Sequence, residues 1–191
     1  MITAMTHRNL SAPRWVVFVW CGLAFFCLFF LTSCSVGNYT PDAAIAKGVG
    51  KNLEAFPGSV AIENAQESRL EQHLGFLNTV VNYHDFTQSV VDALKNELQA
   101  KGTTVAPDAN KKLSVQVVEV SYFQEAVTYR AVIKANVQTG AGDIHRFESS
   151  RASYASGANM TFAAKKPLDA AFKDLVSNIL KDTSIQAYLK N

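Results

Sequence analysis

Leu113-Ser-Val-Gln-Val-Val-Glu-Val-Ser-Tyr-Phe123 and Tyr129-Arg-Ala-Val-Ile-Lys-Ala-Asn-Val137 are the two stretches that decide the fold of this chain. In the second stretch every other residue is apolar, a period of two that predicts a strand with one buried face. In the first stretch the alternation changes phase once, which predicts either a strand buried on both faces or a β-bulge near Val117. A sheet with one covered face favours the bulge. The short connection Gln124-Glu125-Ala126 makes the two strands an antiparallel hairpin.

Two further strands are predicted around this hairpin. Gly140 and Gly142 mark a second tight turn, after which residues 144–155 form a mostly polar strand. Because that strand has few large nonpolar side chains, we expect it at an edge of the sheet. Upstream, Val60 and Ile62 alternate within residues 59–63 and predict an earlier strand. Residues 64–82 have no pattern that predicts a firm element.

Two helices are predicted on either side of the hairpin. Asp85-Phe-Thr-Gln88 has the capping-box pattern of a helix start, and Lys101-Gly102 ends that helix. The second helix begins at Pro167, a residue suited to a first helical turn. Its apolar side chains form one stripe at helical spacing: Leu168, Ala171, Phe172, Leu175, Val176, Ile179 and Leu180. Thr183-Ser184 then caps a short terminal turn.

The order β-α-β-β-β-α predicts an α+β fold. We expect a two-layer domain over residues 58–191, with a mainly antiparallel sheet and two helices on one face. Of the 191 residues, 48% are apolar and 18% are charged, which is a globular composition.

The N-terminal 33 residues differ from the rest of the chain. Arg8 and Arg14 precede an uncharged apolar run over residues 15–31, the pattern of a signal peptide. A retained transmembrane helix is the alternative, because a run of this length is just long enough to cross a bilayer. Cys34 favours the signal peptide, since Leu31-Thr-Ser-Cys34 resembles a bacterial lipobox, where cleavage precedes a lipidated cysteine.

Cleavage at this lipobox makes Cys34 the lipidated N-terminus. We expect covalent lipid there, palmitate included, and no other cofactor. Cys21 and Cys27 leave with the signal peptide, so no disulfide or cysteine metal site remains. Ser35 resembles the outer-membrane sorting residue of Gram-negative lipoproteins. Residues 34–57 are small, polar and interrupted by Gly and Pro, and predict a flexible tether that spans roughly 25 Å.

Several stretches together resemble the YajG-type family of bacterial lipoproteins. Beside the lipobox they are Leu94-Lys-Asn-Glu-Leu-Gln-Ala-Lys-Gly102, the valine-rich hairpin, Arg151-Ala-Ser-Tyr154 and Asp182-Thr-Ser-Ile-Gln-Ala-Tyr-Leu-Lys190. The likeness covers residues 83–191, and its C-terminal stretch is the most specific part. It implies an outer-membrane lipoprotein that faces the periplasm. That family has no established biochemical activity, so the resemblance assigns no functional residues.

Patterns for catalysis or metal binding are sparse. His73, His84 and His145 stand singly, without the paired spacing that directs two ligands at one metal. A glycosidase-like pair of strand carboxylates is a remote alternative to solvated acids. Without residues 1–33 the basic and acidic side chains are equal in number, so the net charge falls from +2 to zero and nucleic acid is not an expected partner.

A set of cationic residues is the sharper candidate for a site. Arg130 and Lys134 share a strand face, and the neighbouring strand carries Arg146, Arg151 and Tyr154. They predict an anion-binding strip for lipopolysaccharide phosphates or peptidoglycan carboxylates. The alternative is that the cations pair with acids on an exposed sheet face, namely Glu119, Glu125 and Glu148.

We therefore expect a non-enzymatic, lipid-anchored protein with an accessory or interaction role in the cell envelope and an envelope protein as its partner. The alternative is an auxiliary lipoprotein that binds a lipid or an anionic ligand for a transport or assembly system. A deep apolar pocket beneath the sheet favours the ligand, whereas an open strand edge favours the protein partner.

Overall fold

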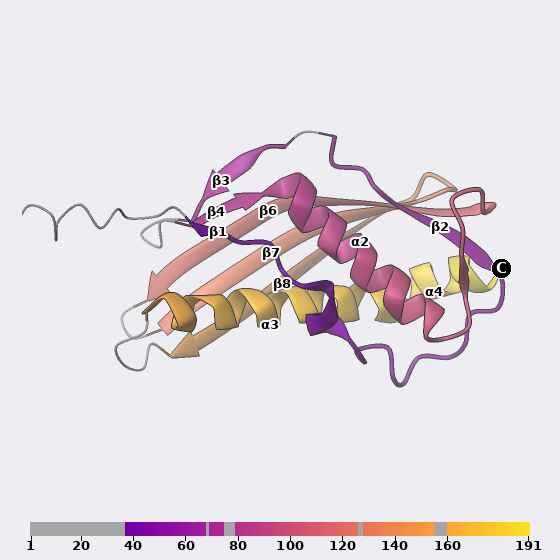
Figure 1. The fold of residues 1–191 in the computed structure, drawn as a ribbon. Helices are drawn as coiled ribbons and strands as arrows, with labels where there is room; N and C mark the ends of the chain where they lie inside the picture. Colours follow the sequence, from indigo (N-terminus) through magenta and orange to yellow (C-terminus); the bar gives the residue numbers. More distant parts are fainter. Residues whose placement is uncertain (1–36, 68, 75–78, 126–127, 155–159) are drawn as a thin grey trace, which may run out of the picture. The chain divides into compact units, whose positions relative to one another are not determined.

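The computed structural model describes residues 37–67, 69–74, 79–125, 128–154 and 160–191, which belong to one compact unit, Val36–Asn191 (Figure 1). In chain order the elements are β1 (Gly37–Asn38), the 3-10 helix η1 (Ala43–Ala46), β2 (Ser59–Asn64), β3 (Glu71–His73), β4 (Thr79–Asn82), α2 (Tyr83–Gln99), β5 (Thr104–Val105), β6 (Lys111–Glu125), β7 (Thr128–Thr139), β8 (Ile144–Tyr154), α3 (Met160–Lys181) and α4 (Thr183–Lys190). The predicted signal peptide, Cys34 and Ser35 lie outside the described residues.

The larger sheet contains five strands in the order β5-β2-β6-β7-β8. Strands β6, β7 and β8 are consecutive antiparallel neighbours, whereas β2 runs parallel to both β5 and β6. The parallel pairing of β2 with β6 is possible because α2 lies between them in the chain and crosses back along the sheet. Helices α2 and α3 cover one face of this sheet, so the predicted two-layer α+β fold is confirmed (Figure 1).

The main core lies between the two helices and the sheet. Alternate residues of β7 from Tyr129 to Val137 are buried, as the period of two predicts. The apolar stripe of α3 is buried as well, and Phe172 makes an edge-to-face contact with Phe86 of α2 at 6.0 Å between ring centroids. Removing this apolar surface from water is the main term that holds the layers together.

The predicted bulge in β6 is confirmed. The pairing of β6 with β7 shifts register between Val117 and Glu119. Beyond Val115, where the pairing with β2 ends, two hydroxyls of α2 accept hydrogen bonds from the backbone of β6. Thr87 Oγ1 accepts from the Val117 N–H at 3.1 Å, and the Tyr83 hydroxyl accepts from the Val120 N–H at 3.2 Å. This edge of β6 is therefore covered by α2.

Residues 37–57, predicted to belong to a flexible tether, are instead packed on the domain. Strand β1 pairs in parallel with β4, which also pairs with β3, so these three strands form a second sheet. Tyr39, Ala46 and Phe56 are buried, and the Tyr39 hydroxyl donates to Asp169 Oδ1 of α3 at 2.6 Å. These apolar side chains stand at irregular spacing between Gly and Pro, so no periodicity reveals their burial. The folded domain therefore includes residues 37–57, which the prediction placed in the tether before residue 58.

The N-caps of two helices differ from the prediction. Asn82 caps α2 by accepting from the Asp85 N–H at 3.1 Å, so Asp85 lies within the first turn. Asp182, rather than Thr183, caps α4, and its carboxylate accepts from two N–H groups of the first turn. In both cases two capping residue types stand close together in the sequence, and local pattern alone does not rank them.

Helix α3 begins earlier than predicted. It starts at Met160, so Pro167 lies inside the helix and not in its first turn. A proline removes one helical N–H donor, and here the helix continues on both sides of it.

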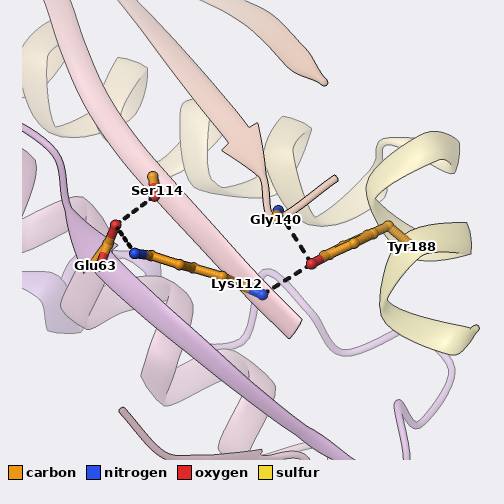
Figure 2. A network of polar contacts seen from close by, with 5 residues as sticks. All are labelled: Glu63, Lys112, Ser114, Gly140 and Tyr188. Carbon is orange, nitrogen blue, oxygen red and sulfur yellow. Dashed lines mark hydrogen bonds and ion pairs between the residues drawn. The ribbon is translucent and has the colours of Figure 1, made fainter. Parts of the chain in front are cut away.

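A polar network joins α4 to the start of β6 and the end of β7 (Figure 2). The Tyr188 hydroxyl accepts from the backbone N–H groups of Lys112 at 3.0 Å and Gly140 at 3.2 Å. On the other side of β6, Glu63 Oε1 contacts Lys112 Nζ at 2.7 Å and accepts from Ser114 Oγ at 2.7 Å. Through Tyr188, the C-terminal helix is thus hydrogen-bonded to the start of β6 and to the turn that follows β7.

Candidate binding surface

The predicted cationic residues do not lie on one face of the sheet. Arg130 and Lys134 alternate with the buried residues of β7 and point to the face opposite the helices. Arg146 lies on that same face, because it is opposite Asn136 in the pairing of β7 with β8. Arg151 is opposite the buried Ala131 and lies on the helix-covered face. We call the face opposite the helices the outer face.

Two of the outer-face cations are engaged by acids. Arg130 donates to both carboxylate oxygens of Glu125, at 2.8 and 3.1 Å. Lys134 Nζ lies 2.8 Å from Glu119 Oε2, and this hydrogen bond holds the pKa of Glu119 below its ordinary value. The Arg130 hydrogen bond likewise lowers the pKa of Glu125. The alternative of pairing with neighbouring acids is therefore confirmed for Arg130 and Lys134.

Arg151 forms an ion pair with Asp174 of α3 and so connects β8 to the helix layer. This hydrogen bond raises the pKa of the guanidinium further above its ordinary value. The sequence pattern did not indicate this partner, because Asp174 lies on a helix and is distant in the chain. A structural role accounts for this contact.

Arg146 and Tyr154 are two further predicted site residues that are exposed on β8. Within the described part of the chain, Arg146 makes no ion pair. Tyr154, at the end of the strand, has 77% of its surface exposed. The two residues lie at opposite ends of β8, so they are separate contact points and not a single cluster.

Strand β8 is the longer of the two edge strands of the larger sheet. The strand has 11 residues and forms one end of the strand order, as its polar sequence predicts. The other end of the order is β5, which has only 2 residues. Among the residues that the structure describes, no strand pairs with the second edge of β8. An edge strand of this length can accept a strand from another chain.

Three hollows in the described part of the chain are lined by residues of the segment that was predicted as a tether. One of about 260 Å³ is lined by residues of η1, by Lys47 directly after it, and by residues of α2 that include Glu97. The Glu97 carboxylate is buried and accepts from the backbone N–H groups of Gly48 at 2.6 Å and Gly50 at 2.8 Å. Sequence analysis did not select Glu97, although its position three residues after Leu94 places it on the apolar stripe of α2.

The histidines have separate surroundings. His84 Nδ1 lies 2.7 Å from the Gln66 carbonyl oxygen, and His145 Nδ1 lies 3.8 Å from Asp182 Oδ1. His73 is exposed on β3. Among the described residues, no group of three or more His, Cys, Asp and Glu side chains is placed to hold a metal ion. None of the helices in the described part is long and apolar enough to cross a membrane.

Comparison with known proteins supplies the family. A family described as uncharacterised lipoprotein matches residues 64–190, which is most of the domain. This chain belongs to that lipoprotein family. The match includes α2, the β6–β8 hairpins, α3 and α4, so the stretches that resemble lipoproteins in sequence form the body of the fold. No curated protein matches the chain.

Solved structures that resemble this lipoprotein are distant in sequence. Rare lipoprotein B from Shewanella oneidensis is 10% identical, with a TM-score of 0.46, 70% of this chain covered and 99% of the other. A minor lipoprotein from Acinetobacter baumannii is 13% identical, with a TM-score of 0.44, 68% of this chain covered and 94% of the other. A protein from Xanthomonas campestris is 16% identical, with a TM-score of 0.44, 71% of this chain covered and 85% of the other.

Proposed function

We propose that this lipoprotein is anchored in the outer membrane of a Gram-negative cell by lipid on Cys34, faces the periplasm, and binds another envelope protein without catalysing a reaction. The lipobox and the family support the anchor. Ser35 and the resemblance to YajG-type lipoproteins support the outer membrane as its location.

The open edge of β8 is the observation that carries the binding role. A partner strand that adds to this edge forms backbone hydrogen bonds along up to 11 residues, and exposed side chains such as Arg146 select the partner. The opposite side of the sheet offers no such site, because β5 is short and α2 covers the free part of β6.

The alternative, binding of a lipid or small ligand, depends on a deep apolar pocket beneath the sheet. The space between the sheet and the helices is filled by fully buried side chains, among them Phe86, Phe172 and Ile133. The hollow beside Glu97 lies against η1 and the outside of α2. The structure therefore favours a protein partner over an enclosed ligand.

The anchor is tested with Cys34→Ala, with Cys27→Ala as the matched control. We expect Cys34→Ala to abolish labelling by radioactive palmitate and to leave an uncleaved precursor in the inner membrane, while Cys27→Ala is processed normally. Ser35→Asp tests the location, because loss of the sorting residue is expected to retain the lipidated protein in the inner membrane. Normal processing and lipid labelling of Cys34→Ala would refute the proposed anchor.

The β8 edge is tested with Ser150→Pro and Arg151→Pro. Successive residues of an edge strand point their N–H groups alternately at the neighbouring strand and outward, so one of these prolines faces β7 and the other the open edge. Arg151→Pro is compared with Arg151→Ala, because both lose the ion pair with Asp174, and Ser150→Pro is compared with the parent. The proline variant that unfolds as its reference does is the one that blocks the edge. We expect it to lose the crosslinks that a photoreactive residue at Arg146 forms in intact envelopes. Retention of those crosslinks would argue against strand addition.

A further inference from the structure

The folded domain begins immediately after the proposed lipid anchor. Strand β1 starts at Gly37, and the Tyr39 N–H donates to the Val80 carbonyl at 2.8 Å, so the chain is held in the second sheet from its first described residues. Three Cα–Cα steps separate Cys34 from Gly37, and they span at most about 11 Å. A domain attached in this way is held close to the lipid surface, whereas a tether over residues 34–57 would have let it stand away.

Strand β1 lies at one end of the domain, and the C-terminus lies at the other (Figure 1). The same end contains the last residues of β6, the first residues of β7, the last residues of β8 and the start of α3. Lys165 of α3 lies over the Tyr39 ring, with Nζ 5.9 Å from its centroid, so this part of α3 is next to β1. We call this the anchor end.

The anchor end carries exposed aromatic residues. Phe123 is 49% exposed and Tyr154 is 77% exposed. In the register of the sheet, Phe123 is opposite Arg130, and Tyr154 is opposite Thr128, so the two aromatic residues lie on the outer face in the last rows of the hairpins. Aromatic side chains in this state of exposure are typical of the boundary between lipid tails and headgroups.

The charge at the anchor end also suits a lipid surface. Lys165 and Lys166 are exposed, and neither makes an ion pair within the described residues. The nearby acid Glu125 is already neutralised by Arg130. Two exposed ammonium groups, neither in an ion pair with a described residue, beside exposed aromatic rings match a surface of anionic phosphates above an apolar interior.

We propose that the anchor end is a membrane-contact surface, on which Phe123 and Tyr154 enter the phospholipid interface while Lys165 and Lys166 contact headgroup phosphates. This proposal rests on lipidation of Cys34. It orients the domain, because the long axis of β8 then leads away from the membrane and Arg146 lies distant from it.

The test uses the mature, lipidated protein in vesicles of phosphatidylethanolamine and phosphatidylglycerol. Both tryptophans of the chain, Trp15 and Trp20, leave with the signal peptide, so a single introduced tryptophan reports its own surroundings. Phe123→Trp and Tyr154→Trp place the reporter at the anchor end. Ile144→Trp is the matched control, since Ile144 is 58% exposed at the opposite end of β8, roughly 33 Å along the strand.

We expect brominated lipids to quench most of the emission of Phe123→Trp and Tyr154→Trp, and to leave that of Ile144→Trp unchanged. Replacement of Lys165 and Lys166 by glutamine is expected to reduce quenching only in vesicles that contain phosphatidylglycerol. A flexible insert of about twenty residues before Gly37, which extends the reach by roughly 25 Å, is expected to abolish quenching at both reporters.

Mass spectrometry of the same samples shows whether Cys34 carries lipid, so failure of the lipid anchor can be distinguished from failure of the membrane-contact surface. If the N-terminal peptide carries lipid and neither reporter is quenched, or if all three reporters are quenched equally, the membrane-contact surface is refuted and the anchor stands. If Cys34 carries no lipid, both the anchor and the membrane-contact surface are refuted.

Discussion

Replacement of Glu97 by alanine tests whether residues 37–57 belong to the fold. The carboxylate is buried on α2 and accepts from the Gly48 N–H at 2.6 Å and the Gly50 N–H at 2.8 Å. A Cβ atom added at Gly50 would lie 2.9 Å from Glu97 Oε2, so the loop backbone reaches the carboxylate only because a glycine stands there. Glu97 thus connects the N-terminal segment to the helix layer.

The cost of Glu97→Ala follows from these two contacts. The Gly50 hydrogen bond is buried, so its donor loses a charged acceptor without gaining water, at a cost of about 1.5–3 kcal/mol. The Gly48 donor is part-buried and regains hydration, so its loss adds little to the cost. Alanine has a higher helix propensity than glutamate, which offsets the cost by a few tenths of a kcal/mol. We expect a net loss of about 1–2.5 kcal/mol, a substantial fraction of the roughly 5–15 kcal/mol by which domains are stable.

Urea unfolding measures the total loss, and amide hydrogen exchange at Gly48 and Gly50 locates it. The matched control is Asp92→Ala. It removes another carboxylate of the same helix, one that accepts a single hydrogen bond from Gln88 at 2.9 Å. That surface pair contributes about 0.2–0.5 kcal/mol, so the control is expected to unfold almost as the parent does. If Gly48 and Gly50 exchange at unchanged rates in Glu97→Ala, the carboxylate does not hold the segment.

Three further perturbations test other parts of the structure. Phe172→Ala, at a fully buried ring, is expected to lower the free energy of unfolding by about 3–5 kcal/mol in urea unfolding. Phe123→Ala on the outer face is the control and is expected to cost much less. Equal losses for the two variants would place Phe172 outside the core. Gly140→Ala puts a Cβ atom 2.7 Å from the Tyr188 hydroxyl, so we expect it to destabilise the domain. The destabilisation is expected to be smaller in a Tyr188→Phe background, where the hydroxyl is absent. Strict additivity of the two substitutions in a double-mutant cycle would contradict that contact. The pKa of Glu119 is lowered from 4.5 in the folded state, so its contribution is present above pH 4.5 and is lost as the pH falls through the lowered pKa. Glu119→Gln is therefore expected to lower stability slightly near neutral pH and to have no effect below the lowered pKa, which flattens the acid limb of the stability-pH curve. A loss of the same size at every pH would contradict the assignment.

Patterns in the chain predicted the strands and the helix stripe because each depends on neighbours along the sequence. The alternation in β7 and the spacing in α3 state which face of each element is apolar, and that face is buried in the structure. The phase change near Val117 likewise predicted the bulge. The cations of β7 were also predicted correctly to have acids within reach, since cross-strand neighbours follow from hairpin register.

The sequence by itself determined the fold class, the core-facing residues and the polar edge strand, because periodicity records which side of an element avoids water. Only the tertiary structure decided that residues 37–57 are packed, that Glu97 holds their backbone, and that Arg151 pairs with Asp174. Each of these contacts joins residues far apart in the chain. Their free energy depends on burial and on the direction of particular donors and acceptors, which no local spacing of residue types specifies.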